Sequence, residues 1–264
     1  GIYQYTTTDI PPGSYEAKIA LNETWDVSYG VDGGNVPFTV EADGEEVTFT
    51  YNSLDNSVYV GDVISAGDLS QSKAYWLNEN TIAFAVTPDA NVQLHFDAQA
   101  DMTSSPEGVS GGEAITLTHD ANGMSDVLAE KFPHLANYPV FTIAEADLEQ
   151  IGDILKGQIA VSASNEDGSL VDATGVQIPG VLDDLYTYDG DLGPVYDGDV
   201  PSVHLWAPTA QNVTFLLYPD SHTDTAPTEL PMTFNAETGV WSITGDASWD
   251  RQYYQFDVEV YVPQ

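Results

Sequence analysis

The sequence has no cysteine and very few basic residues. Without a thiol it forms neither a disulfide nor a thiolate metal site. Five Lys and Arg stand against 42 Asp and Glu, which gives a formal net charge of -37 at pH 7 and an isoelectric point near 4.1. Nucleic acids and anionic membrane surfaces bind basic faces, so no nucleic acid and no membrane is expected as a partner. We expect a neutral or cationic partner.

Long apolar runs are also missing. No segment approaches the roughly 18 apolar residues of a transmembrane span, and no signal peptide is visible at the N-terminus. The hydrophobic content of 42% still predicts a globular chain. Because salt screens the self-repulsion of so acidic a chain, we expect a salt-rich or marine habitat. The alternative is a large acidic docking surface.

Turn residues and hydrophobic alternation divide the 264 residues into three units. In the first and last units, apolar and polar residues alternate between Gly-, Asp- and Asn-containing turns, as half-buried antiparallel strands do. The predicted fold class is mainly β, with tandem immunoglobulin-like β-sandwich modules flanking a β-rich unit that has two short helices. The predicted modules are residues 1–62, 63–185 and 186–264.

Several elements can be predicted individually. We expect helices over Asp126–Phe132 and Ala144–Leu155, the second with apolar residues at helical spacing. The apolar stretch Val176–Leu185 is interrupted by Pro179 and Gly180, so it suits a packed connector better than a long helix. Predicted strands include Gly13–Leu21, Ser202–Ala207, Thr228–Phe234, Gly239–Thr244 and Tyr253–Val262.

Several phrases in one order carry a family resemblance. QIPGVLDDLY (Gln177–Tyr186), followed by HLWAPTAQNV (His204–Val213), resembles the N-terminal region of pullulanase-type α-1,6-glucosidases of glycoside hydrolase family 13. In that family the WAPTA phrase opens a family 48 carbohydrate-binding module. Similar pieces occur upstream in the same order: PPGSYEAKIALNETWDVSYG (Pro11–Gly30), KFPHLANY (Lys131–Tyr138) and ILKGQIAV (Ile154–Val161).

The resemblance implies the non-catalytic N-terminal region of a secreted starch-debranching enzyme. Such a region would bind α-glucan, such as pullulan, amylopectin or glycogen, and pack against the catalytic barrel of the same parent chain. Both ends of the sequence read as cut, and the β/α alternation of a barrel is missing, so we expect an extracellular fragment that is inactive alone. Two alternatives are a purely structural collar and a stand-alone β-sandwich adhesin, neither of which binds sugar.

The first unit offers a candidate carbohydrate-binding loop. Proteins stack a pyranose ring on an aromatic side chain and hydrogen-bond its hydroxyls through polar neighbours. Lys18, Asn22, Trp25 and Asn35 lie close in sequence, and alternation places Lys18 opposite the apolar side of its strand. Their K-x-x-x-N-x-x-W spacing is similar to the glycan-contacting hairpin of starch- and glycogen-binding modules. In the alternative, Trp25 only caps the sandwich edge. Trp249, in a turn, is a second stacking candidate.

The remaining tryptophans are expected to be structural. Trp206 and Trp241 lie within predicted strands, which favours core positions, and Trp76 is expected to anchor the middle unit. His134 is expected to pack or hydrogen-bond at a helix end rather than bind metal. The tryptophan with the strongest claim to a ligand is therefore Trp25.

No cofactor is predicted, and calcium is the one metal considered. The acidic turns Asp183–Asp184, Asp189–Asp191 and Asp197–Asp199 place hard oxygen ligands in loops, as calcium prefers. None of them fits a twelve-residue calcium loop, and acidic turns are common in so acidic a chain. With 42 carboxylates, pairs at catalytic spacing also arise by chance, so no catalytic residue is assigned.

Overall fold

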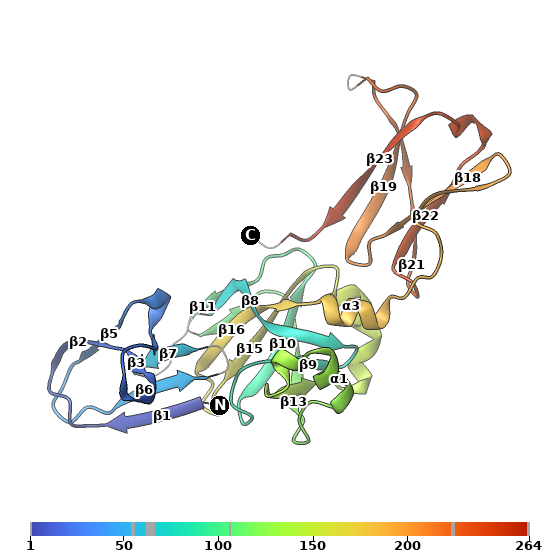
Figure 1. Cartoon of the computed structure of the whole chain (residues 1–264). Coiled ribbons are helices and arrows are strands. Elements are labelled where there is room, and N and C mark those ends of the chain that lie inside the picture. Colours follow the sequence, from blue (N-terminus) through green and yellow to red (C-terminus); the bar gives the residue numbers. More distant parts are fainter. Residues whose placement is uncertain (1, 54–55, 62–66, 106, 223–224, 263–264) are drawn as a thin grey trace.

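The computed structural model describes residues 2–53, 56–61, 67–105, 107–222 and 225–262. A small β module lies on one side of a central barrel, and a second β module extends from the other side (Figure 1). The predicted fold class, mainly β, is confirmed. The predicted boundary at residues 62 and 63 lies outside the described residues. Across the described ranges, none of the helices has the length and apolarity to span a bilayer.

The first module consists of short antiparallel sheets joined by aromatic contacts. Its largest sheet has the order β1-β6-β7, and smaller pairs form between β2 and β5 and between β3 and β4. Phe38 packs edge-on against Phe49 across the module at a ring separation of 5.5 Å. The strands are β1 (Ile2–Thr7), β2 (Gly13–Ala17), β3 (Ile19–Ala20), β4 (Ser28–Tyr29), β5 (Val36–Val40), β6 (Val47–Asn52) and β7 (Ser57–Val60).

The predicted strand Gly13–Leu21 is wrong as a single element. It is interrupted at Lys18, because the chain changes partner there from β5 to β4. It then ends in the 3₁₀ helix η1 (Leu21–Glu23), where Asn22 adopts the left-handed conformation with φ 56°. Asparagine tolerates this conformation better than most residues, so the turn can form here.

The middle unit is a closed barrel with the strand order β10-β13-β14-β9-β8-β16-β15. All neighbouring pairs are antiparallel except β16 and β8. Trp76 is buried in the core, which confirms its predicted role as an anchor. The strands are β8 (Asp68–Asn78), β9 (Thr81–Ala83), β10 (Asn91–Asp97), β13 (Glu113–His119), β14 (Val140–Thr142), β15 (Gln158–Ser164) and β16 (Leu170–Gln177), and a hairpin of β11 (Thr103–Ser105) and β12 (Gly108–Ser110) accompanies them.

The two predicted helices differ in outcome. Helix α1 (Asp126–Lys131) forms as expected, and the Ser125 hydroxyl caps its N-terminus. The helix predicted over Ala144–Leu155 is instead a 3₁₀ helix, η4 (Glu145–Gln150), followed by one α-helical turn, α2 (Ile151–Ile154). Its buried residues follow the predicted apolar spacing, but its first half makes the tighter i to i+3 hydrogen bonds.

The predicted connector before the third module contains a third helix, α3 (Pro179–Leu185). Pro179 occupies the first turn, where a missing N–H leaves no helical hydrogen bond unmade. Gly180 allows α3 to lie directly on β8, since a Cβ at this position would be 2.6 Å from the Trp76 carbonyl oxygen. Both residues that argued against a helix therefore fit this one.

The third module is a sandwich of two sheets, with the orders β17-β18-β22-β21 and β20-β19-β23. The strand predicted over Thr228–Phe234 is wrong as one element. It divides at the buried Met232, so that one half joins each sheet. The strands are β17 (Gly193–Asp197), β18 (Val200–Trp206), β19 (Ala210–Tyr218), β20 (Thr228–Pro231), β21 (Thr233–Asn235), β22 (Val240–Thr244) and β23 (Tyr253–Val260).

Two tryptophans in the strands of this sandwich face opposite ways, one into the core and one toward solvent. Trp241 is buried and its indole N–H donates to the Ala207 carbonyl at 3.0 Å, which confirms the predicted core position. The core position predicted for Trp206 is wrong, because its side chain is 37% exposed. Val203 and Leu205 contribute to the core, so the next residue along the strand faces outward.

A buried histidine in the barrel makes stability depend on pH. The Nε2 atom of His95 lies 2.8 Å from the Ser162 hydroxyl, and burial lowers the pKa of His95 below its ordinary value of 6.5. The unfolded chain then binds a proton more readily than the folded chain. The contribution of His95 to folding is therefore complete above about pH 6.5 and decreases as the pH falls toward the folded pKa.

We predict that His95→Gln flattens the dependence of unfolding free energy on pH between about 5.5 and 7.5. Glutamine can still hydrogen-bond Ser162 but does not titrate. Urea denaturation across this range provides the measurement, with the exposed His222→Gln as the matched control. Identical slopes for the wild-type chain and His95→Gln would contradict the prediction.

Candidate carbohydrate-binding surfaces

The first candidate surface is the tip of the hairpin formed by β3 and β4. Two residue pairs, Ile19 with Tyr29 and Ala20 with Ser28, form its ladder. The seven residues 21–27 that follow are closed by a main-chain hydrogen bond from the Leu21 N–H to the Val27 carbonyl at 3.0 Å. A second main-chain hydrogen bond, from the Thr24 N–H to the Leu21 carbonyl at 3.2 Å, lies within this loop, so backbone contacts help to hold the tip in shape.

The tip presents an uncovered aromatic ring. Trp25 is 73% exposed, and Val27 and Val31 are exposed beside it in the sequence. This exposure disagrees with the alternative in which Trp25 caps the sandwich edge, because a capping ring would be covered by the strands beneath it.

Lys18 and Asn35 lie at the base of the hairpin rather than at its tip. The Lys18 ammonium donates to the Gly33 carbonyl at 3.1 Å, and the Asn35 amide donates to the Glu16 carboxylate at 2.9 Å. The structure thus brings Lys18 and Asn35 together at one end of β3, whereas Asn22 and Trp25 lie at the other end. Sugar contact by each of these four residues stays a prediction.

A glycine pair shapes the loop between the hairpin and β5. A Cβ on Gly30 would lie 2.1 Å from the Gly34 carbonyl oxygen, so the two backbone segments touch. This close approach holds the 3₁₀ helix η2 (Val31–Gly33), whose last carbonyl accepts the hydrogen bond from Lys18. Lys18 therefore connects the start of β3 to this loop through a hydrogen bond, a structural role that the sequence spacing of Lys18 and Trp25 does not indicate.

Trp249 is more enclosed than its place in a turn suggested. It ends the 3₁₀ helix η5 (Ala247–Trp249), and its ring stacks on Phe215 with centroids 5.2 Å apart and planes 14° apart. Gly245 also lies against the indole, since a Cβ there would be 2.2 Å from Cδ2. Sugar contact by Trp249 stays a prediction, but Phe215 already occupies one face of the ring.

A second aromatic surface was missed from the sequence. Tyr218 pairs with Tyr253 across β19 and β23, and its hydroxyl donates to the Gln255 side chain at 3.2 Å. With Asp220 and His222 these residues line a hollow of about 390 Å³. Tyr253 is 55% exposed. The signal in the sequence was strand parity, which turns Tyr253 and Gln255 to the same face, whereas the predicted stacking partners were tryptophans alone.

Metal ligands do not cluster in the part of the chain that the structure describes. Within those residues, no group of three or more His, Asp or Glu side chains is placed to hold an ion. The loop position predicted for Asp183 and Asp184 is wrong, because both residues lie in α3. There an Asp184 carboxylate oxygen accepts from the Glu79 N–H at 2.8 Å, and Asp183 lies 3.9 Å from the Lys131 ammonium. Calcium binding by the acidic turns stays a prediction. His134 packs edge-on against Tyr75 with ring centroids 6.0 Å apart, as expected of a structural residue.

Three family models match successive parts of the chain. The Pullulanase X25 domain matches residues 1–58, and the Pullulanase N2 domain matches residues 71–184. Carbohydrate-binding module 48 (Isoamylase N-terminal domain) matches residues 191–262. The chain is a pullulanase N-terminal region. The barrel described above corresponds to the N2 domain, and the third module corresponds to the family 48 carbohydrate-binding module.

Several similar proteins are named pullulanases. Pullulanase 1, chloroplastic, of Arabidopsis thaliana is 37% identical over 197 residues, which cover 74% of this chain and 20% of that protein. Pullulanase of Klebsiella pneumoniae is 30% identical over 205 residues, which cover 76% and 18%. A crystal structure of the K. pneumoniae enzyme in complex with maltotriose matches with a TM-score of 0.66 at 27% identity, over 75% of this chain and 21% of that one. The chain therefore spans about a fifth of the length of these pullulanases.

Proposed function

We propose that this pullulanase N-terminal region binds α-glucan for a secreted starch-debranching enzyme whose catalytic barrel lies elsewhere in the same parent chain. The carbohydrate-binding module 48 match and the pullulanase relatives support the substrate class. The observation that carries the proposal is the Trp25 indole, 73% exposed at the tip of a backbone-closed hairpin. In this account the region itself is not a hydrolase, and it packs against the barrel.

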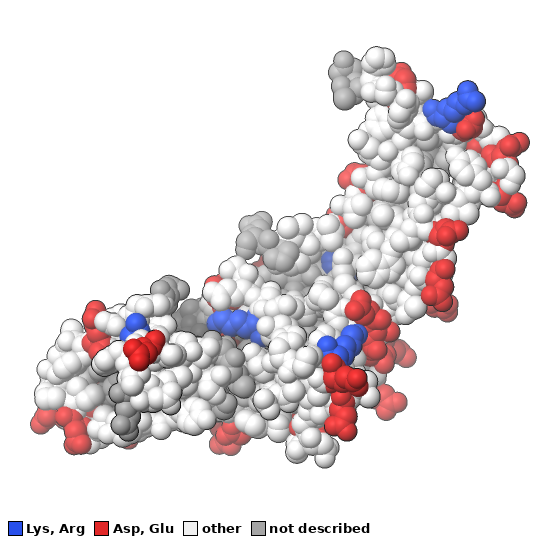
Figure 2. All heavy atoms as spheres, in the orientation of Figure 1, with Lys and Arg blue, Asp and Glu red and all other residues white. Residues whose placement is uncertain are grey.

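An exposed, pre-shaped tip suits an uncharged polymer whose sugar rings have apolar faces. The indole offers an apolar plate of the size of a sugar ring, and the closed loop loses little conformational entropy when the ligand binds. Figure 2 shows acidic side chains over all three modules and few basic ones on the face in view. This charge repels anionic ligands, but a neutral glucan is unaffected by it. The chemistry of the surface therefore favours a neutral saccharide.

We predict that Trp25→Ala weakens retention by α-glucan roughly tenfold, since an exposed stacking contact contributes on the order of 1 kcal/mol or slightly more. Affinity electrophoresis in gels with and without amylopectin or pullulan measures this directly. Trp206→Ala, which removes a partly exposed tryptophan from the third module, is the control and should migrate like the wild-type chain.

The same gels separate glucan binding from a purely structural collar. A collar predicts that amylopectin leaves the mobility of the wild-type chain and of both tryptophan variants unaltered. Retention that survives Trp25→Ala but disappears in the Trp25→Ala, Tyr253→Ala double variant would place the dominant contact on the tyrosine hollow of the third module. In that case the function would stand and the assignment to the hairpin tip would be wrong.

We propose in addition that the parent protein works in a salt-rich or marine habitat. The formal charge of -37 on 264 residues supports this, because repulsion among so many carboxylates opposes the compact state. Raising the ionic strength from about 0.1 M to about 1 M shortens the screening length from about 10 Å to about 3 Å. We predict that the melting temperature followed by circular dichroism rises over this range. A melting temperature indifferent to salt would argue against the habitat.

A further inference from the structure

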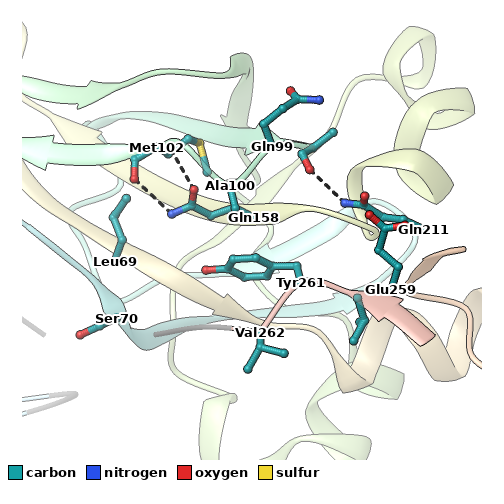
Figure 3. A pocket seen from close by; sticks show the side chains of 12 residues that line it. Leu69, Ser70, Gln99, Ala100, Met102, Gln158, Gln211, Glu259, Tyr261 and Val262 are labelled. Atoms are coloured by element: carbon teal, nitrogen blue, oxygen red, sulfur yellow. Dashed lines mark hydrogen bonds between the residues drawn. The ribbon is translucent and has the colours of Figure 1, made fainter. Parts of the chain in front are cut away.

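A polar pocket lies in the joint between the barrel and the third module. Its volume is about 480 Å³, and its walls come from the turn after β10, from β15, and from the end of β23 with the residues that follow it. Figure 3 shows the Tyr261 ring between Gln158 and Val262, with Gln211 and Glu259 at one end of the pocket. The pocket is distant in sequence from the Trp25 tip.

The walls of this pocket are held in place by hydrogen bonds. The buried Gln158 side chain accepts from the Met102 N–H at 2.9 Å and donates to the Met102 carbonyl at 3.2 Å (Figure 3). Gln211, from the third module, donates its Nε2 to two barrel carbonyls, Ala98 at 2.9 Å and Lys156 at 3.1 Å. The joint and the pocket that it contains therefore have a defined geometry.

The turn after β10, which forms one wall of the pocket, has a strained backbone. Ala100 has a φ of 62°, in the left-handed region that alanine rarely adopts. The turn presents the Ala98 carbonyl to Gln211 and places the exposed Gln99 at the rim. Backbone strain of this kind costs on the order of 1–3 kcal/mol and persists where the surrounding contacts require it. Here the Asp97 carboxylate holds the turn, because it accepts from the Gln99 N–H at 3.3 Å and from the Asp101 N–H at 2.7 Å.

The hydrogen-bonding groups left open in the pocket suit hydroxyls. Within the described part of the chain, three side-chain groups of the lining have no hydrogen-bond partner: the Glu259 carboxylate, the Tyr261 hydroxyl and the side-chain amide of Gln99. Together they offer donors and acceptors beside one aromatic ring, the set that recognises a sugar. None of the lining residues is basic, and Glu259 repels anions. The lining therefore favours a neutral ligand rich in hydroxyl groups.

We propose that this pocket binds a short neutral oligosaccharide of the α-glucan class, at a site separate from the Trp25 tip. The choice of α-glucan rests on the proposed function, whereas the preference for a neutral saccharide rests on the pocket itself. The volume lies within the range of small-molecule sites. A bound oligosaccharide contacts the barrel through Gln99 and the segment that follows β23 through Tyr261, so it bridges the joint.

The three methionines of the chain provide a selective test. Met102 lines the pocket, whereas Met232 belongs to the core of the third module and Met124 packs beside a different cluster of the barrel. In protein labelled with ¹³C at the methionine methyl groups, titration with maltotriose should shift the Met102 resonance saturably and leave the other two in place. An unmoved Met102 resonance at saturating maltotriose would overturn the proposal.

Two variants and a matched control sharpen this test. Tyr261→Ala and Glu259→Ala should each weaken the Met102 titration by about tenfold, the loss of one good polar or stacking contact. Asp257→Ala removes another exposed carboxylate, from the same strand but outside the pocket, and should have no effect. If the Met102 titration is unchanged in both Tyr261→Ala and Glu259→Ala, this pocket is not the binding site.

Failure of the pocket and failure of the hairpin tip can be told apart. Trp25→Ala should leave the Met102 titration with maltotriose unchanged while it reduces retention by amylopectin. If the wild-type chain shows no retention but Met102 still titrates, the pocket stands and the tip does not. If retention depends on Trp25 but Met102 never responds to maltotriose, the proposed function stands and the pocket proposal is wrong.

Discussion

The structure depends on how one threonine closes the barrel. Strands β8 and β16 are its only parallel neighbours within the described residues, and their register shifts on both sides of Gly175. The Thr174 hydroxyl, fully buried, accepts from the Lys73 N–H at 3.1 Å and donates to the Gln71 carbonyl at 2.9 Å. It therefore satisfies two backbone groups that the irregular ladder leaves unpaired, each of which would otherwise cost about 1–3 kcal/mol. The next residue, Gly175, has no room for a side chain, because a Cβ there would be 2.8 Å from the Gln71 carbonyl oxygen.

This closure also places the flanking modules. The chain enters the barrel at β8 from the first module and leaves it at β16 through α3 toward the third, so the two sandwiches lie on opposite sides of the barrel (Figure 1). Tyr186, buried at the end of α3, packs against the barrel core and is approached by Gly239 of the third module. With Gln211 on the other side of the joint, the barrel holds this module at two points.

The sequence predicted what depends on local pattern. Alternation and turn residues were enough for the mainly β fold class, and strand position was enough for Trp241. The hydrophobic pattern was not enough where pairing with another strand decides the bounds of a strand or the burial of a side chain. Leu205 faces the core, so Trp206 faces outward, and the segment Thr228–Phe234 changes sheets at the buried Met232, where its two halves pair with β19 and β22. The pairing of β8 with β16 joins residues about a hundred positions apart, which no local signal encodes.

The candidate site shows the same division. Trp25 could be singled out from its loop and from its spacing to Lys18 and Asn22, which are local features, and the ring is exposed in the structure. The hydrogen bonds of Lys18 and Asn35 were not foreseen, since they depend on how the loop before β5 folds back on the hairpin. The tyrosine hollow arises only when β19 pairs with β23. The joint pocket is lined by five separate segments of the chain, so sequence spacing contains no sign of it.

The central claim is that glucose rings stack on the Trp25 indole, and the spectrum of the five indole N–H groups tests it most directly. In ¹H–¹⁵N spectra recorded during titration with maltoheptaose, the account predicts a saturable shift of the Trp25 resonance while that of the buried Trp76 stays in place. A Trp25 resonance that does not move at saturating maltoheptaose would contradict the account, whatever the other indoles do.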